Sequence, residues 1–297
     1  MSDTPTFATA GDGTRLYAVE AGDGTPVVFV HEFGDDHRAW APQIAALARR
    51  HRCVAFNARG YPPSDVPDDP KHYSQAHAVA DVLAVLDHLG IVRAHVVGCS
   101  MGGFAALHFA LDHPDRTLSV TAIGAGYGAE KEHEAYFRET SLRVAGNFER
   151  LGAEHFAETY GSGASRVQYQ AKDPAGWRGF VGRLAEHSSQ GSALTMRGVQ
   201  ARRPSLYDME ARFRAMRAPA LVIVGDEDDH CLQPALYLKR TIPACGLCVL
   251  PKTGHAANLE EPELVNRVLG DFLALVDAGR WLPRDPRAVP GEVMRTA

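Results

Sequence analysis

Short apolar runs alternate along the first half of this chain with longer segments of helical periodicity. The apolar runs, each bounded by turn residues, are residues 26–30, 53–57, 94–98 and 118–125. Runs of this kind are typical of strands buried on both faces of a sheet. The segments between them repeat apolar residues every three to four positions and comprise residues 40–50, 75–90 and 101–114. This spacing predicts amphipathic helices. A Gly-rich stretch at residues 7–24 predicts an opening β-hairpin.

The alternation of strands and helices stops near Gly126 and resumes near residue 218. Between these points the chain has a polar, mostly helical pattern with scattered aromatic residues and no strand pattern. Strands alternating with helices predict an α/β fold with a mostly parallel sheet covered on both faces. We therefore expect a core domain of residues 1–126 and 218–279, an inserted helical cap of residues 127–217, and a Pro- and Arg-rich extension of residues 280–297.

Composition and charge narrow the class of protein. Of the 297 residues, 45% are hydrophobic and 23% charged, which is typical of an ordinary globular protein. A formal net charge of −5 without a dense basic run argues against a nucleic-acid partner. The polar amino terminus does not resemble a signal peptide, and no apolar run has the length of a membrane span. Five scattered cysteines fit a reducing cytoplasm, where we expect the protein to reside.

The sequence Gly98-Cys99-Ser100-Met101-Gly102 lies between a predicted strand and a predicted helix. A G-x-S-x-G motif in this position turns a strand sharply into a helix and exposes the serine hydroxyl at the edge of the sheet. Glycines on either side relieve the crowding that such a turn creates. A serine hydroxyl is a weak nucleophile and needs a neighbouring base, so the motif depends on a partner elsewhere in the chain.

A histidine and a group of carboxylates follow the last two predicted strands. His255 comes directly after one strand, and Asp226, Glu227, Asp228 and Asp229 come after the strand before it. The carboxyl ends of parallel strands meet at one edge of a sheet, so these side chains should lie near the serine. A carboxylate is needed to hold the tautomer of the base and to stabilise its protonated form. The chain order serine, acid, histidine is the one that this kind of sheet requires.

Together these motifs resemble the α/β-hydrolase superfamily, from about Thr14 to Val276. The resemblance implies an α/β-hydrolase fold with a helical cap and a catalytic triad of Ser100, Asp228 and His255. Members of the family commonly place the acid three residues after the glycine that ends the strand, which selects Asp228. Asp226 is the second choice and would more often stabilise a turn. The proline that usually follows the acid comes later than expected in this chain.

An oxyanion hole needs two backbone N–H donors. One would be the amide of Met101, directly after the nucleophile. The resemblance places the second at Phe33, in the sequence His31-Glu32-Phe33-Gly34, where the family pattern has glycine instead of Glu32. One interpretation is that Glu32 pairs with a neighbouring cation or lines the pocket; the other, which we favour, is a solvent-facing or internally paired carboxylate. Tyr127 and Trp177 of the predicted cap could also line the pocket, although most cap aromatics should only pack it against the core.

The activity that fits these parts best is hydrolysis of a carboxylic ester, with a small ester or lactone as substrate. The residues after His255 resemble those of enol-lactone hydrolases, whereas Ala256 replaces the tryptophan that carbon–carbon bond hydrolases often carry there. The alternatives on the same triad are a cofactor-free perhydrolase or haloperoxidase-like activity and carbon–carbon bond hydrolysis, followed by a ligand-binding protein without catalysis. We expect no cofactor, no metal and no membrane partner.

A homodimer formed through the tail after Arg280 is a further hypothesis. Arg59, in a loop that resembles a family motif, should tie loops together by hydrogen bonding.

Overall fold

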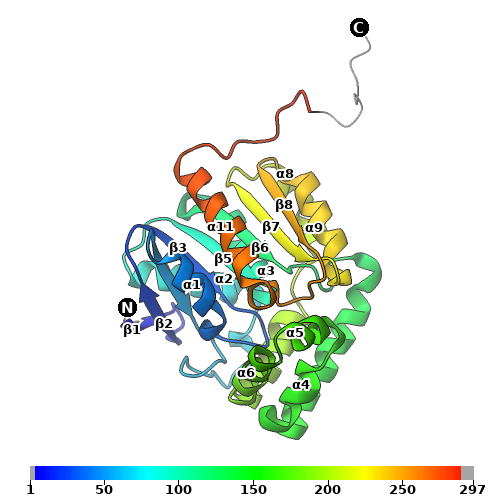
Figure 1. Cartoon of the computed structure of the whole chain (residues 1–297). Coiled ribbons are helices and arrows are strands. Elements are labelled where there is room, and N and C mark those ends of the chain that lie inside the picture. The colour runs from blue at the N-terminus through cyan, green and yellow to red at the C-terminus, as the bar shows by residue number, and fades with distance from the viewer. Residues whose placement is uncertain (1–3, 289–297) are drawn as a thin grey trace.

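The computed structural model describes residues 4–288 and contains one eight-stranded sheet in the order β1-β2-β4-β3-β5-β6-β7-β8 (Figure 1). The strands are β1 Thr4–Thr9, β2 Arg15–Ala21, β3 Thr25–Val30, β4 His51–Phe56, β5 Ala94–Cys99, β6 Thr117–Ile123, β7 Ala220–Gly225 and β8 Cys245–Leu250. Strands β1 and β2 form an antiparallel hairpin, and β2 pairs antiparallel with β4. All other neighbours are parallel. The predicted mostly parallel sheet and the predicted hairpin are both confirmed.

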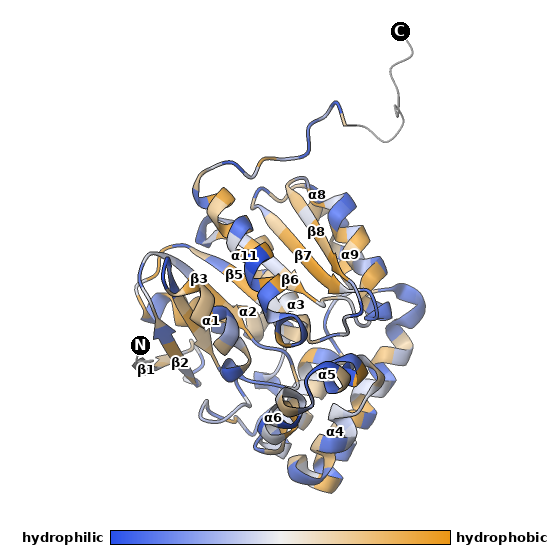
Figure 2. Cartoon of the chain, viewed as in Figure 1, coloured by the Kyte–Doolittle hydropathy of each residue, from blue (hydrophilic) through white to orange (hydrophobic). Residues whose placement is uncertain are grey.

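Helices cover both faces of the sheet. They are α1 Ala41–Leu47, α2 Gln75–His88, α3 Met101–Asp112, α9 Asp229–Thr241, α10 Ala257–Glu260 and α11 Pro262–Asp277. One apolar core joins one face of the sheet to α2, α3 and α9, and a second core joins the other face to α1 and α11. Figure 2 shows that the central strands are largely hydrophobic, whereas the helices carry polar positions as well. Burial of β5, β6 and β7 on both faces explains why their sequences are nearly continuous apolar runs.

Further helices occupy the chain between β6 and β7. They are α4 Lys131–Gly161, α5 Val167–Lys172, α6 Pro174–Ala185, α7 Ser189–Thr195 and α8 Glu210–Arg214. Figure 1 shows α4, α5 and α6 grouped beyond one end of the sheet. Phe148 and Phe156 of α4 share an apolar cluster with Phe33 and Met101, which follow β3 and β5. The inserted helices therefore cover the carboxyl ends of these strands. That residues 127–217 form a separate cap domain stays a prediction.

Local capping explains where several helices begin. The Ser74 side chain accepts a hydrogen bond from the His77 amide at the start of α2. Asp173 and Ser188 cap α6 and α7 in the same way, accepting from the amides of Gly176 and Gly191. Such caps satisfy amides that have no partner within the helix. Short 3-10 turns occupy His37–Trp40, Pro70–His72, Pro114–Arg116, Ala164–Arg166 and Leu206–Met209, and a π-helical turn occupies Met196–Gln200.

The start of the carboxyl-terminal extension lies on the core of its own chain. Trp281 packs edge-on against Phe272 with a centroid separation of 4.7 Å, and its indole N–H donates to the Ala244 carbonyl at 2.8 Å. Trp281 is therefore engaged within its own chain, while Leu282 is exposed. Residues 289–297 of the predicted extension lie outside the described residues, and dimerisation stays a prediction. Within residues 4–288, none of the helices combines the length and the apolar character needed to cross a bilayer.

Candidate active site

Ser100 lies at the turn from β5 into α3, as the motif predicted. Its backbone has φ 51° and ψ −113°, a left-handed conformation that is unusual for a residue with a side chain. Strain of this kind persists only where the surrounding structure enforces it, and it is often found at active sites. The side chain is largely buried, at the amino terminus of α3. The positive end of the helix dipole would stabilise negative charge that develops there.

Close backbone packing around the turn explains the two glycines of the motif. A Cβ atom at Gly98 would lie 2.0 Å from the carbonyl oxygen of Gly102. A Cβ atom at Gly102 would lie 2.0 Å from the carbonyl oxygen of Val30, at the end of β3. Neither position can hold a side chain unless the backbone moves. The missing side chains let α3 start directly against β5 and against the loop that contains Phe33.

The structure brings the three predicted triad residues into one hydrogen-bonded chain. The Nε2 atom of His255 lies 2.8 Å from the hydroxyl oxygen of Ser100, and its Nδ1 atom lies 2.7 Å from Oδ2 of Asp228. His255 lies in the loop between β8 and α10, and Asp228 lies between β7 and α9. All three residues are buried, with 8% or less of each exposed. An Nδ1–H donated to Asp228 leaves Nε2 free to accept the serine proton.

The surroundings keep Asp228 ionised. Burial alone would raise the pKa of this carboxyl group, but the charge and the hydrogen bond of His255 outweigh burial and lower the pKa below its usual value. A carboxylate beside the imidazole favours the protonated histidine that forms when the serine loses its proton. The arrangement therefore provides a base and the negative charge that stabilises the protonated base.

The second-choice acid has a different environment. Oδ1 of Asp226 accepts a hydrogen bond from the Thr253 amide at 3.2 Å, which holds the turn after β8 beside the turn after β7. No hydrogen bond joins Asp226 to His255 among the described residues. The geometry thus separates the two aspartates: Asp228 contacts the histidine, and Asp226 stabilises a turn.

Two backbone amides beside Ser100 have the property that an oxyanion hole requires. Within the described part of the chain, the N–H groups of Phe33 and Met101 donate no hydrogen bond to another protein group. Met101 is the first residue of α3, where the amide has no intrahelical acceptor. The loop of Phe33 is held by His31, whose Nδ1 contacts the Glu32 carbonyl at 2.6 Å and whose Nε2 accepts from the Ala58 amide at 3.0 Å. Burial lowers the pKa of His31 and thus favours its neutral form.

The predicted pocket residues have three different surroundings. Glu32 is buried and forms an ion pair with Arg166, which comes from the helices between β6 and β7. The ring of Tyr127 lies edge-on to that of His255, with centroids 5.5 Å apart. Trp177 packs in an apolar cluster that includes Ala256, and its indole N–H donates to the Gly161 carbonyl at 2.8 Å. Tyr127 therefore lies beside the triad and Glu32 is an internally paired carboxylate, whereas the observed contacts of Trp177 are packing contacts.

Sequence reasoning did not identify Cys231, which lies beside the triad. Its Sγ atom lies 3.9 Å from Nδ1 of His255 and donates to the Gly124 carbonyl at 3.3 Å. Burial raises the pKa of this thiol, so it stays protonated. Asp228, Cys231 and His255 offer three atoms close enough to hold a metal ion. However, a metal on Nδ1 would displace the proton that the histidine donates to Asp228.

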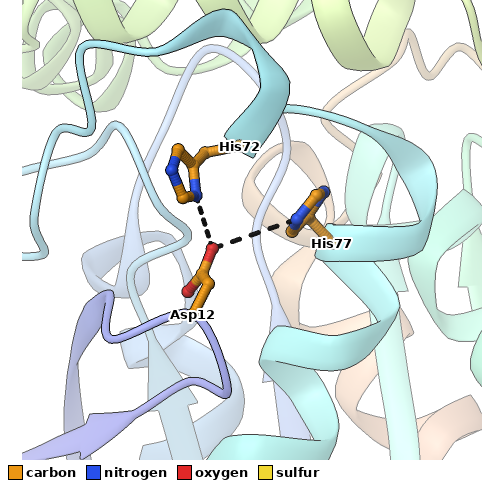
Figure 3. Close-up of side chains that lie close together, drawn as sticks. All are labelled: Asp12, His72 and His77. Carbon is orange, nitrogen blue, oxygen red and sulfur yellow. Dashed lines mark hydrogen bonds and ion pairs between the residues drawn. The ribbon is translucent and has the colours of Figure 1, made fainter.

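A second group that could hold a metal lies at the surface, between the turn after β1 and the start of α2 (Figure 3). Oδ2 of Asp12 lies 2.7 Å from Nδ1 of His72 and 3.9 Å from Nε2 of His77. The same oxygen accepts a hydrogen bond from Arg59 at 2.7 Å, so a metal there would meet a fixed positive charge. Arg59 also forms a two-fold ion pair with the buried Asp81. The group thus ties loops together, as predicted for Arg59.

Comparison with known proteins places the chain in a family. A family model described as "alpha/beta hydrolase fold" matches residues 25–262. A 2-hydroxy-6-oxo-6-phenylhexa-2,4-dienoate hydrolase of Burkholderia cepacia is 30% identical over 273 residues, which covers 88% of this chain and 91% of the relative. A 3-oxoadipate enol-lactonase of Acinetobacter baylyi is 25% identical over 248 residues, which covers 83% of this chain and 88% of the relative.

Structural comparison agrees with the sequence comparison. The crystal structure of the enol-lactonase from Burkholderia xenovorans LB400 matches with a TM-score of 0.80 and 24% sequence identity, over 91% of this chain and all of that one. At that identity, the likeness shows the fold alone. The chain belongs to the α/β-hydrolase family. Its relatives act on different bonds, so the family establishes a hydrolase without specifying the substrate.

Proposed function

We propose that this protein is a serine hydrolase that cleaves a carboxylic ester through an acyl-enzyme intermediate. The substrate is a small ester or a lactone. The observation that carries the proposal is the continuous hydrogen-bonded chain from Ser100 through His255 to the buried Asp228. This chain is the arrangement by which a serine is activated for attack on a carbonyl carbon. The two free amides of Phe33 and Met101 add support, because the attack places negative charge on the carbonyl oxygen.

The proposed reaction has two halves. His255 takes the proton of Ser100 as the serine oxygen attacks the carbonyl carbon, and the amides of Met101 and Phe33 stabilise the oxyanion. His255 then protonates the leaving alcohol as the carbon–oxygen bond breaks, which leaves the acyl group on Ser100. Water attacks the acyl-enzyme and gives its proton to His255, which returns it to Ser100 as the acid leaves. Asp228 orients His255 in both halves and stabilises its protonated form.

A small apolar cavity of about 20 Å³ borders the nucleophile turn at Met101 and Gly102. Thr195 and Val199 of the inserted segment complete part of its wall. A cavity of this volume has room for about one water molecule, and neither Ser100 nor His255 lines it. It therefore does not define the substrate, and the proposal is carried by the triad geometry.

Carbon–carbon bond cleavage is the second candidate, favoured by the 30% identity to the Burkholderia cepacia dienoate hydrolase. Ala256 replaces the tryptophan that such enzymes often carry after the histidine. For this reason we rank carbon–carbon bond cleavage below ester hydrolysis. Peracid formation on the same triad is a further alternative. Turnover of a dienoate ketone, of a peracid-forming mixture and of an ester, each compared with the Ser100→Ala variant, separates the three.

Treatment with a fluorophosphonate probe, followed by mass spectrometry, tests the proposal. We expect labelling of Ser100 alone and turnover of short-chain p-nitrophenyl esters. Ser100→Ala should lose the labelling and reduce kcat by roughly three orders of magnitude or more, because removal of a triad member leaves only binding and oxyanion stabilisation. Absence of both labelling and Ser100-dependent turnover in the folded protein would contradict the proposal and favour a ligand-binding protein.

A further inference from the structure

Arg166 is a buried cation next to the proposed active site, and part of its guanidinium group has no partner. The residue is 2% exposed and comes from the short turn Ala164–Arg166, between α4 and α5. One terminal nitrogen, Nη2, pairs with Glu32. Within the described part of the chain, Nε and Nη1 are buried and make no hydrogen bond to protein. Buried donors without a protein partner are rare, and each calls for a ligand or water to satisfy it.

The contacts of this turn place Arg166 between the two loops that flank the nucleophile. On one side, Glu32 directly precedes the proposed oxyanion donor Phe33. On the other side, the carbonyl of Ser165 accepts a hydrogen bond from the amide of His255 at 3.1 Å. The ring of Phe180 covers the guanidinium at 4.9 Å from its centroid. The hydroxyl of Tyr160 also lies close enough to the guanidinium for the positive charge to act on its pKa. Arg166 is thus surrounded by Glu32, Phe180 and Tyr160, while Nε and Nη1 make no hydrogen bond of good geometry to a described protein group.

Glu32 changes what those two donors can bind. An unpaired guanidinium attracts carboxylates most strongly, because it offers charge as well as hydrogen bonds. Here the carboxylate of Glu32 already balances the positive charge of Arg166. The other buried charges near the triad also oppose one another, because Asp228 is negative and Arg203, which donates to the carbonyl of Tyr127 at 2.6 Å, is positive. An anionic group of a substrate would therefore lose its hydration without gaining a net charge attraction, whereas an uncharged oxygen would gain the hydrogen bonds at a lower desolvation cost.

We propose that Nε and Nη1 of Arg166 form a polar subsite for an uncharged oxygen of the acyl part of the substrate, such as a ketone, and that Glu32 excludes acyl parts that end in a carboxylate. This inference rests on the proposed function and specifies its substrate class. The preferred substrates are esters or lactones of oxo acids. Glu32 and Arg166 determine specificity in this proposal and take no part in proton transfer.

Two sets of methyl esters of equal length test the subsite. The first set is methyl 4-oxopentanoate, methyl pentanoate and monomethyl succinate, and the second is methyl 5-oxohexanoate, methyl hexanoate and monomethyl glutarate. In the wild-type protein, kcat/KM should be about tenfold higher for at least one oxo ester than for its alkyl counterpart, as expected for hydrogen bonds from a charged donor. The half-ester with a free carboxylate should be the poorest substrate of its set.

Variants of Arg166 should lower the ratio of kcat/KM for the oxo ester to that for the alkyl ester. A variant of Glu32 should raise the ratio of kcat/KM for the half-ester to that for the alkyl ester. Arg166→Met should reduce the oxo-to-alkyl ratio to about one, and Arg166→Lys, which keeps the charge but lacks the Nε and Nη1 donors, should do the same. Glu32→Gln should raise the ratio of half-ester to alkyl ester at least tenfold, because the guanidinium is then unbalanced. Arg197→Met, which breaks an exposed ion pair with Glu149 in the same inserted segment, is the matched control and should leave both ratios unchanged.

Binding to the Ser100→Ala protein, measured by calorimetry, gives a readout that needs no turnover. Tighter binding of the oxo ester than of the alkyl ester, lost when Arg166→Met is added, supports the subsite even if no ester is hydrolysed. Equal binding of the two esters, or ratios that do not respond to Arg166→Met and Glu32→Gln, would overturn the subsite and leave a buried structural ion pair. The rate of Ser100 labelling by fluorophosphonate in each variant reports separately on the nucleophile.

Discussion

The two aspartates that follow β7 differ in what their carboxylates contact, although they are only two positions apart. Asp228 is 2% exposed and lies 2.7 Å from Nδ1 of His255. Asp226 accepts from the Thr253 amide instead. The carboxylate of Asp228 acts on the charge and tautomer of the proposed base, whereas that of Asp226 stabilises a turn. We therefore expect substitution of Asp228 to lower activity and substitution of Asp226 to lower stability.

Replacement of each aspartate by asparagine tests this difference. Asp228→Asn should lower kcat by roughly 10³- to 10⁴-fold, because the amide no longer stabilises the protonated histidine or favours the required tautomer. Asp226→Asn should keep kcat within a few-fold of wild type and lower the melting temperature slightly. The measurement is ester turnover at saturating substrate, with thermal unfolding of both variants. An equal loss of kcat in both variants would contradict the assignment.

At the scale of elements, the turn from β5 into α3 depends on a close approach between backbones. Gly102, in the first turn of α3, lies against the carbonyl of Val30 at the end of β3. The contact sets the position of the loop that carries Phe33 relative to the helix that carries Met101. The two proposed oxyanion donors belong to different elements, so their spacing is a property of this packing.

Gly102→Ala should be severely disruptive, because its Cβ atom would lie 2.0 Å from the Val30 carbonyl oxygen. Forced movement of packed backbone costs typically 1–3 kcal/mol, occasionally more, so we expect a loss of stability in that range together with loss of ester turnover. Gly146→Ala in α4 is the control, since an added Cβ there meets no atom within 4 Å. It should raise stability by up to about 1 kcal/mol through helix propensity. Urea unfolding of both variants is the measurement; equal stability would contradict the packing argument.

At the scale of the whole molecule, buried histidines should make stability depend on pH. Burial lowers the pKa of His187 to about 3 and that of His108 to about 4, from an ordinary value of 6.5. The unfolded chain binds protons at these residues at a higher pH than the folded protein does. Stability is therefore unaffected above about pH 6.5 and falls as the pH drops below that value, toward the folded pKa values.

His187→Phe should remove part of this dependence. Between pH 7.5 and pH 5 the wild type should lose about 2 kcal/mol of unfolding free energy through His187, from the 1.36 kcal/mol that each pKa unit represents. The variant keeps a ring beside Tyr61, which His187 contacts edge-on at 5.0 Å. His155→Phe, at an exposed position of α4, should keep the wild-type dependence. Urea unfolding at both pH values provides the measurement, and identical slopes in wild type and His187→Phe would contradict the expectation.

Local patterns in the sequence were enough to predict the class of fold and the residues that meet at the candidate site. Burial on both faces makes a strand a continuous apolar run, and this signal lies within five or six consecutive residues. The nucleophile motif is equally local, since its glycines and its serine occupy a single turn. That His255 and a carboxylate after the preceding strand would lie near Ser100 followed from parallel strands whose carboxyl ends share one edge. The choice of Asp228 among the four carboxylates of that loop rested on the resemblance to the α/β-hydrolase superfamily. The structure brings these residues within hydrogen-bonding distance, and their catalytic role stays a prediction.

Tertiary structure alone decided which distant side chains meet. Glu32 was notable in the sequence because glycine is usual there, yet its partner Arg166 is 134 residues away and is one of 31 lysines and arginines. Periodicity reports which face of an element is buried, but not which other element covers that face. Cys231 beside His255, and Trp281 on its own core, could not be assigned from the sequence for the same reason. The order of strands, the partners of buried charges and the walls of the pocket depend on how all the elements pack together, and no local pattern records that packing.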